Sequence, residues 1–216
     1  MTPRVLHVDP ASPRDEGVRV AVDALRAGEV IAIPTETFYG LAADSLAESA
    51  VRRLNALKHK AGDSPALLLL ASVDQASGVA SDLPPSFHKL AAAFWPGPLT
   101  LVVRAAPGLS EAVTGGRGTV GVRVPGLALP RRIAERLERP ITGVSANRHG
   151  RPASRTAAEV HRAFPHGLGM ILDGGPTPGG AASTILDLTG PEPLVVRIGA
   201  VPLEALRPFV PALSDA

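Results

Sequence analysis

Residues 28–41 have the sequence Gly28-Glu29-Val30-Ile31-Ala32-Ile33-Pro34-Thr35-Glu36-Thr37-Phe38-Tyr39-Gly40-Leu41. Within it, Val30-Ile31-Ala32-Ile33 is a short apolar run rich in β-branched residues, which favours a buried strand. Pro34 ends the run, because proline has no N–H to donate to a strand ladder. We therefore predict a buried strand that leads into a loop carrying two threonine hydroxyls and a glycine.

The segment before this strand has the pattern of an amphipathic helix. Gly28 is placed to end that helix, and Ser12-Pro13-Arg14-Asp15 predicts its start, with Ser12 as the N-cap and a proline in the first turn. The apolar residues that recur at helical spacing are Val18, Ala21, Val22 and Leu25.

Helices and strands alternate through the rest of the chain. Helices are predicted over 46–58, 85–94 and 127–137, and Thr156-Ala157-Ala158-Glu159 opens another with a capping-box pattern. Strands are predicted over 66–71, 99–104, 119–124, 141–145, 170–172, 183–188 and 194–198. This alternation predicts an α/β protein with one mixed, twisted sheet flanked by helices. The hairpin-like spacing of the last strands disfavours a purely parallel sheet.

Composition predicts one soluble domain over residues 1–216. The chain is 45% hydrophobic and 19% charged, which is enough apolar material for a core. It has no cysteine, so disulfides, thiolate nucleophiles and Cys-ligated zinc are excluded. The N-terminus shows no apolar targeting segment, and the longest apolar run, Ala66 to Ala71, falls short of the roughly 20 residues of a membrane span. We expect a cytoplasmic protein with no membrane partner.

Positive charge is concentrated in one part of the chain. Between Arg123 and Arg162 there are nine Arg and three Glu, a local charge of +6, although the whole chain carries only +2. Such a bias favours phosphate-bearing partners such as nucleotides or RNA. An arginine-rich solvated surface explains the same composition equally well.

Four predicted strands run into polar or glycine-containing segments. These are Pro34-Thr35-Glu36-Thr37, Val144-Ser145-Ala146-Asn147, Asp173-Gly174-Gly175 and Arg197-Ile198-Gly199. Loops beyond strand ends are where α/β sheets collect ligands, and hydroxyls, amides and backbone N–H groups suit phosphate and carboxylate oxygens. Each segment taken alone is also ordinary turn chemistry.

The common catalytic motifs are absent from the sequence. It has no Walker A sequence, dinucleotide-binding glycine fingerprint, His-Glu-x-x-His or Gly-x-Ser-x-Gly. Ser145 and His149 lie close in sequence, but nothing else supports a hydrolase triad. Lys58-His59-Lys60 follows a predicted helix. Cations are common at the C-terminal end of a helix, where they interact favourably with the helix dipole. The functional alternative is that the two lysines bind a nucleotide phosphate.

Taken together and in order, these segments resemble the YrdC-like threonylcarbamoyl-AMP synthase family. Residues 28–41 resemble the family's opening signature, and the similarity covers about residues 15–202. The later segments that carry it are Lys58-x-Lys60, Trp95-Pro96-Gly97-Pro98-Leu99-Thr100, Thr119-Val120-Gly121-Val122-Arg123-Val124-Pro125, Ser145-Ala146-Asn147, Asp173-Gly174-Gly175, Ser183-Thr184-Ile185-Leu186-Asp187 and Arg197-Ile198-Gly199.

The resemblance implies a YrdC-like fold with a large concave, positively lined cavity. It also implies a nucleotidyltransferase reaction. Bicarbonate and L-threonine form N-carboxythreonine, which attacks the α-phosphate of ATP to give threonylcarbamoyl-AMP and pyrophosphate. Partner transferase proteins then pass the threonylcarbamoyl group to tRNA. Mg²⁺ is expected with ATP; Glu36 and Asp173 are candidates to hold it through water, and its ligands are left unassigned.

The resemblance also assigns site residues. It implies that Lys58, Lys60 and Arg123 are catalytic. The residues implied to bind threonine are Thr35, Arg123, Ser145 and Ser183. Those implied to bind ATP are Lys58, Lys60, Ser64, Thr119, Asn147 and Arg197. Guanidinium groups suit these roles, because they pair bidentately with carboxylate and phosphate.

The sequence departs from the family pattern at two places. Lys60 stands where family members usually have Arg, which keeps the charge but loses the planar fork. Residues 144–150 read Val144-Ser145-Ala146-Asn147-Arg148-His149-Gly150, with two hydroxyls fewer than the family pattern. Three alternatives stay open: a YciO-like paralogue with different acyl-adenylate chemistry, a carbamoyltransferase module, and a double-stranded RNA or tRNA-binding module without catalysis.

Overall fold

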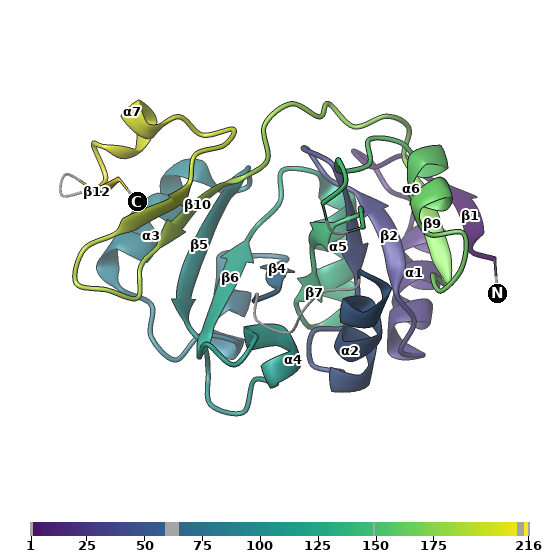
Figure 1. Ribbon diagram of the computed structural model, residues 1–216, viewed down its shortest axis with the longest axis horizontal. Helices are drawn as coiled ribbons and strands as arrows, with labels where there is room; N and C mark the ends of the chain where they lie inside the picture. The colour runs from purple at the N-terminus through teal and green to yellow at the C-terminus, as the bar shows by residue number, and fades with distance from the viewer. Residues whose placement is uncertain (1, 59–64, 149, 211–213, 216) are drawn as a thin grey trace.

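Two mixed β-sheets stand side by side, as the computed structural model of the chain shows (Figure 1). The structure describes residues 2–58, 65–148, 150–210 and 214–215. The first sheet has the order β1 (Arg4–His7), β9 (Met170–Asp173), β2 (Ile31–Pro34), β3 (Tyr39–Ala42), β8 (Val144–Ser145). The second has the order β12 (Ser214–Asp215), β11 (Leu194–Arg197), β10 (Thr184–Asp187), β5 (Leu99–Arg104), β6 (Thr119–Arg123), β4 (Leu67–Leu69), β7 (Ile141–Thr142).

Helices cover the sheets. The described helical elements are α1 (Asp15–Arg26), α2 (Glu48–Leu57), the 3₁₀ helix η1 (Val73–Gly78), α3 (Pro85–Phe94), α4 (Glu111–Thr114), α5 (Ala128–Leu137), α6 (Ala157–Ala163) and α7 (Leu203–Leu206). Apolar residues of α1 and α5 pack with Ile31 and Ile33 of β2, whereas α2 and α6 pack with Val30 and Ala32. Because successive strand residues face opposite ways, β2 is buried on both faces, as its apolar run predicted. Helix α3 packs on the second sheet in a third cluster.

The α/β class and the mixed strand directions are confirmed, but the strands form two sheets where one was expected. The cause lies in residues 141–145, which were predicted to be one strand. Ile141 and Thr142 pair with β4 of the second sheet, and Val144 and Ser145 pair with β3 of the first. Gly143 lies at the crossing, where a Cβ would come within 2.5 Å of Leu69 Cγ. Only glycine fits there without displacing that side chain.

Residues 28–41 form a hairpin and not a strand followed by a loop. Strand β3 pairs antiparallel with β2, so that Pro34 lies opposite Tyr39 and Ile33 opposite Gly40. The residues at a hairpin tip are those typical of turns. Because the second strand follows these polar residues directly, a search for apolar runs does not detect it. The hairpin tip, residues 35–38, projects from the first sheet toward the second.

Helix boundaries agree with the sequence at some ends and not at others. The N-cap of α1 is Arg14, without a side-chain cap, so the Ser12 prediction is wrong. The Ser12 amide instead donates to Asp9 Oδ1 at 3.1 Å in a local turn. Gly28 follows α1 with φ 76°, as predicted for a residue that ends a helix. The Thr156 cap is confirmed, because its hydroxyl accepts the Glu159 amide at 3.2 Å.

The chain crosses between the sheets again after β9. Residues 174–183 arch from the first sheet to β10 of the second across the top of Figure 1. This segment is tied to the hairpin, because the Gly179 amide donates to the Thr37 carbonyl at 2.9 Å. Among the described helices, none has the length and apolarity that a bilayer span requires.

Candidate functional site

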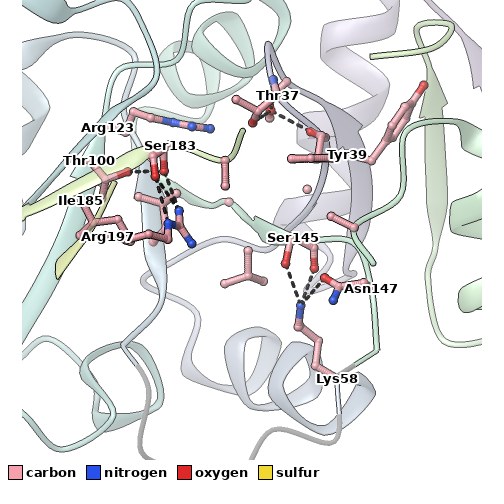
Figure 2. Close-up of a pocket in the computed structure, with 18 of the residues that line it drawn as sticks. Thr37, Tyr39, Lys58, Thr100, Arg123, Ser145, Asn147, Ser183, Ile185 and Arg197 are labelled. Carbon is pink, nitrogen blue, oxygen red and sulfur yellow. Dashed lines mark hydrogen bonds between the residues drawn. The ribbon is translucent and has the colours of Figure 1, made fainter. Parts of the chain in front are cut away.

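A pocket of about 680 Å³ lies where the two sheets face each other (Figure 2). The hairpin tip and β8 of the first sheet form one side, and β5, β6, β10 and β11 of the second sheet form another. Lys58, at the end of α2, reaches in from a third side. The pocket therefore depends on segments that are far apart in the sequence and that meet only because the two sheets are adjacent.

The hairpin side presents two threonine hydroxyls. Thr35 Oγ1 donates to the Phe38 carbonyl at 2.7 Å and accepts the Thr37 amide at 3.2 Å. It also lies 3.1 Å from Thr37 Oγ1. Both side chains are almost fully buried. These bonds fix the hairpin tip, so the two hydroxyls are held in place before any ligand arrives.

Adjacent strands of the second sheet build a hydroxyl–guanidinium cluster. Thr100 Oγ1 donates to Ser183 Oγ at 2.9 Å, and Arg197 Nη2 donates to the same oxygen at 3.2 Å. Arg197 also donates to the Ser183 carbonyl from Nε at 3.1 Å and from Nη2 at 2.8 Å. Since Ser183 Oγ accepts two hydrogen bonds, its own hydrogen is available to a ligand oxygen.

Arg123 lies at the end of β6 and is only 3% exposed. Its Nη1 lies 3.5 Å from Glu36 Oε1 at the hairpin tip. Burial lowers the pKa of Arg123, the Glu36 carboxylate opposes that change, and the charge of Arg197 adds to it. Burial also lowers the pKa of Arg197. Two guanidinium groups thus lie close enough to influence each other at the rear of the pocket.

Lys58 joins a second polar cluster on the opposite side (Figure 2). Its Nζ donates to the Ser145 carbonyl and lies 3.4 Å from both Ser145 Oγ and Asn147 Oδ1. The Asn147 amide donates to the carbonyls of Arg148 and Arg151 at 3.1 and 2.5 Å, which orients its oxygen toward Lys58. Strand β8 and the loop after it thus bring Ser145 and Asn147 next to Lys58, which directly follows α2. All three were predicted as site residues.

Most of the predicted site residues that the structure describes line this one pocket: Thr35, Lys58, Arg123, Ser145, Asn147, Ser183 and Arg197. Thr119 does not line it. It begins β6, four residues before Arg123, or roughly 13 Å away at about 3.3 Å per residue. Lys60 and Ser64 lie outside the described residues, so their predicted roles stay predictions.

Thirteen further lining residues were not singled out as site residues from the sequence, among them Thr37, Tyr39, Thr100, Arg151 and Ile185. Thr37 and Tyr39 belong to the hairpin quoted at the start, so alternation along that segment could have indicated their positions. Thr100 and Ile185 lie opposite each other in parallel strands. Their pairing requires the sheet order, which the sequence does not give.

Tyr39 holds the segment after β9 in place. Its hydroxyl donates to the Gly175 carbonyl at 2.7 Å and accepts the Gly174 amide at 3.2 Å. Burial, with the nearby Asp173 carboxylate, raises the pKa of Tyr39 to about 12. Asp173 also pairs with His7 at 3.3 Å. Asp173 therefore contacts Tyr39 and His7 and is not one of the described pocket-lining residues.

The pocket is strongly positive. Four cationic side chains line it, Lys58, Arg123, Arg151 and Arg197, and no Asp or Glu is among the lining residues that the structure describes. In the described part of the chain, no three His, Cys, Asp or Glu are grouped as a metal site would require. The described lining therefore holds no set of carboxylates of the kind that binds Mg²⁺ directly.

The arrangement suits a ligand, or a pair of ligands, with several anionic groups. Cations and hydroxyl donors converge from two sheets, whereas no carboxylate competes from the described lining. A pocket of this kind accelerates a reaction by orientation and by neutralising charge. Fold and site together define an α/β protein with a pocket between two mixed sheets that is lined by cations and hydroxyl groups.

Comparison with known proteins identifies the family. The family model Sua5/YciO/YrdC, which carries the description "Telomere recombination", matches residues 23–199. The chain therefore belongs to the Sua5/YciO/YrdC family. This confirms the resemblance inferred from the sequence.

Named relatives show the same relationship. A threonylcarbamoyl-AMP synthase of Pyrococcus abyssi is 39% identical over 193 residues, which cover 89% of this chain and 57% of that protein. A putative threonylcarbamoyl-AMP synthase of Mycobacterium tuberculosis is 36% identical over 197 residues, covering 89% of this chain and 88% of the relative. The chain thus spans little more than half of the first relative's length.

Solved structures agree in fold. The P. abyssi Sua5 structure complexed with L-threonine matches with a TM-score of 0.94 and 36% identity, over 98% of this chain and 62% of that one. Escherichia coli YciO matches with a TM-score of 0.85 and 22% identity, over 96% of this chain and 100% of that one. The second likeness concerns the fold alone.

Proposed function

We propose that the protein is an L-threonylcarbamoyladenylate synthase, a nucleotidyltransferase that uses L-threonine, bicarbonate and ATP. The observation that carries the proposal is the pocket between the sheets, which four cations line without a described carboxylate. Support comes from the family, since a relative matched over 98% of this chain is a Sua5 complexed with L-threonine. The product would serve threonylcarbamoyladenosine modification of tRNA in the cytoplasm, through partner transferase proteins.

In the proposed reaction the threonine amine attacks bicarbonate, and water leaves as N-carboxythreonine forms. A carbamate oxygen then attacks the α-phosphorus of ATP. The new P–O bond forms as the bond to the leaving pyrophosphate breaks. No protein nucleophile is needed, which fits a lining of hydroxyls, an amide and cations. Mg²⁺ would enter as part of the MgATP substrate.

The proposed threonine subsite lies at the rear of the pocket. Arg123 would pair with the threonine carboxylate as a planar fork. Ser183 would donate its hydrogen to a ligand oxygen, because Thr100 and Arg197 already fill its acceptor positions. Thr35 would approach the ligand from the hairpin side, alongside Thr37.

The proposed ATP subsite uses the remaining cations. Lys58 and Arg197 would neutralise phosphate charge from opposite sides of the pocket, with Lys60 and Ser64 adding to the same subsite. Asn147, whose side-chain N–H groups bond to the carbonyls of Arg148 and Arg151, would offer its side-chain oxygen to the nucleotide as an acceptor. Ser145 would contribute to the threonine side, as family resemblance implies, whereas Thr119 lies outside the described lining, and its ATP role rests on the resemblance alone.

One assay tests the proposal. The protein is incubated with ATP, Mg²⁺ and bicarbonate, with and without L-threonine, and pyrophosphate and the adenylate product are both measured. We expect both products only when threonine and bicarbonate are present. Pyrophosphate release that does not depend on threonine would support a paralogue with other acyl-adenylate chemistry, a reading that Lys60 in place of arginine favours.

The absence of any turnover at high enzyme concentration would contradict the synthase proposal. In that case tRNA or double-stranded RNA binding that weakens steeply with salt would support the non-catalytic alternative. Lys60→Arg completes the comparison with the usual family pattern. If the protein is a synthase, this variant keeps or increases its activity, because the substitution restores a planar phosphate ligand.

A further inference from the structure

The carboxylate of Glu36 lies behind the pocket wall against Arg123. Glu36 comes from the β2–β3 hairpin of the first sheet, whereas Arg123 ends β6 of the second. Their side chains are 3.5 Å apart at Glu36 Oε1 and Arg123 Nη1, with Glu36 18% and Arg123 3% exposed. The pair therefore joins the two sheets beside the pocket wall that Arg123 forms.

Glu36 has no other polar role among the described residues. Both of its carboxylate oxygens are buried and accept no hydrogen bond, and Arg123 Nε is likewise without a hydrogen-bond partner. Glu36 is also absent from the described pocket lining, so its role is not direct ligand contact. The backbone at Gly126 closes in on its other side, where a Cβ would lie 3.4 Å from Glu36 Cγ.

A buried guanidinium needs a fixed counter-charge. Arg123 is nearly inaccessible to water, and the neighbouring Arg197 has the same sign. Glu36 is the acidic residue paired with it in the described part of the chain. One carboxylate and two guanidinium groups give these three side chains a net charge of +1. The pair is thus stabilised while the wall still attracts an anion.

We propose that Glu36 is a positioning residue, which aims the Arg123 guanidinium into the pocket and ties the hairpin tip to β6. Together with the proposed function, this means that Glu36 determines how well Arg123 receives the carboxylate of the amino-acid substrate. Glu36 acts from behind through Arg123 and does not touch the substrate.

Two effects of removing the Glu36 charge oppose each other. The loss of a nearby anion would strengthen the attraction of Arg123 for a carboxylate ligand. The loss of the counter-charge would also release a buried guanidinium, and breaking a buried pair from one side is strongly destabilising. With 3% exposure, Arg123 has little water to replace Glu36, so the loss of alignment outweighs the gain in attraction.

The first experiment measures ligand binding by calorimetry for the wild type, Glu36→Gln and Glu36→Asp. Glu36→Gln keeps the length and loses the charge, whereas Glu36→Asp keeps the charge and shortens the reach. We expect each variant to bind L-threonine about tenfold or more weakly, a loss typical of a charge-assisted contact, with no change for a non-hydrolysable ATP analogue. Glu192→Gln, at an exposed turn before β11, is the matched control and should bind like the wild type.

Unchanged or tighter threonine binding in Glu36→Gln would overturn the proposal, because Glu36 would then be only a competing charge. Equal weakening for threonine and the ATP analogue would overturn it too, since it would indicate general disruption. If the wild type itself binds no threonine, the proposed function fails. The second experiment, which needs no ligand, then decides whether Glu36 acts through Arg123.

The second experiment is a double-mutant cycle on thermal stability and needs no ligand. In the wild-type background, Glu36→Gln should lower Tm, because Arg123 loses its counter-charge. In an Arg123→Met background the same substitution should raise Tm, because it removes an unpaired buried carboxylate. A decrease of Tm in both backgrounds would show that Glu36 does not act through Arg123.

Discussion

At the scale of single residues, several polar groups of the pocket already make their own hydrogen bonds. Thr35 is held by its hairpin, Ser183 by Thr100 and Arg197, and Asn147 by two loop carbonyls. Such groups lose little conformational freedom when a ligand binds, because protein contacts have already ordered them. Residue substitutions should therefore act on particular ligands and not on the pocket as a whole.

Arg123→Ala should raise the KM for threonine by on the order of 30-fold and leave the KM for ATP much closer to the wild-type value. The reason is that one bidentate carboxylate contact is lost, a charge-assisted interaction of about 2 kcal/mol. Steady-state kinetics with each substrate varied in turn measures the split. Arg162→Ala, an exposed arginine on α6, serves as the control. An equal rise for both substrates would refute the role given to Arg123.

The raised pKa of Tyr39 predicts that the folded protein loses stability at high pH. Its pKa is about 12 in the folded protein and about 10 when the chain is unfolded. The folded state therefore retains the phenolic proton longer. The raised pKa contributes on the order of 2 kcal/mol to the free energy of unfolding. This contribution is fully present below pH 10 and is lost as the pH rises from 10 to 12.

Urea unfolding of the wild type and Tyr39→Phe at pH 8 and pH 11 tests this prediction. At pH 8 the variant should be less stable by about 1–2 kcal/mol, because the Gly174 amide and Gly175 carbonyl lose their partner. At pH 11 the difference should shrink. Parallel losses of stability in both proteins would mean that Tyr39 ionisation is not the cause.

At the scale of elements, local signals predicted the longer helices and most of the strands, but they missed β1, β3, α4 and α7. The Thr156 cap and the helix end at Gly28 depend on neighbouring residues, and both were predicted from sequence, although the Glu159 carboxylate accepts the Arg155 amide and does not complete a capping box. Strand β3 was not predicted, because Tyr39–Ala42 follows polar residues that hid it. The division at Gly143 was missed for a different reason, since it depends on Leu69, which is distant in sequence.

Thr156→Ala should destabilise the protein by about 1 kcal/mol, the usual contribution of an N-cap side chain. The hydroxyl that accepts the Glu159 amide is lost, and α6 packs on the first sheet through Val160 and Phe164. A fall in Tm of roughly 2–4 °C is expected for a chain of this size. Thr156→Ser keeps the oxygen and should stay near the wild-type Tm; an equal fall in both variants would exclude capping as the cause.

At the scale of the whole molecule, the pocket is where the two sheets meet. The chain crosses between the sheets near it twice, at Gly143 and over residues 174–183. The Glu36–Arg123 side-chain pair also joins the two sheets there. A ligand bound there contacts both sheets at once. Ligand binding should consequently stabilise the entire fold and not one sheet alone.

Saturating L-threonine should raise Tm in a concentration-dependent manner. At 100 times its Kd, a ligand that binds only the folded state stabilises it by about 2.7 kcal/mol. For a chain of this length that corresponds to an increase of roughly 5–10 °C. Arg123→Ala should reduce the shift to roughly 2–3 °C at the same threonine concentration, because a ligand that binds about 30-fold more weakly is then at only about three times its Kd, whereas Arg162→Ala should retain the full shift. An undiminished threonine shift in Arg123→Ala would place the amino acid elsewhere.

The amino-acid sequence by itself determined the α/β class, the buried strand before Pro34, the helix-ending role of Gly28 and the family. It also supplied seven residues that line one pocket, because ordered motifs mark the ends of successive strands. Only the tertiary structure decided that the strands form two sheets and that Thr100 and Ile185 join the pocket. It alone placed Glu36 behind Arg123. The physical reason is that strand pairing and side-chain burial depend on residues distant in sequence, which no local pattern specifies.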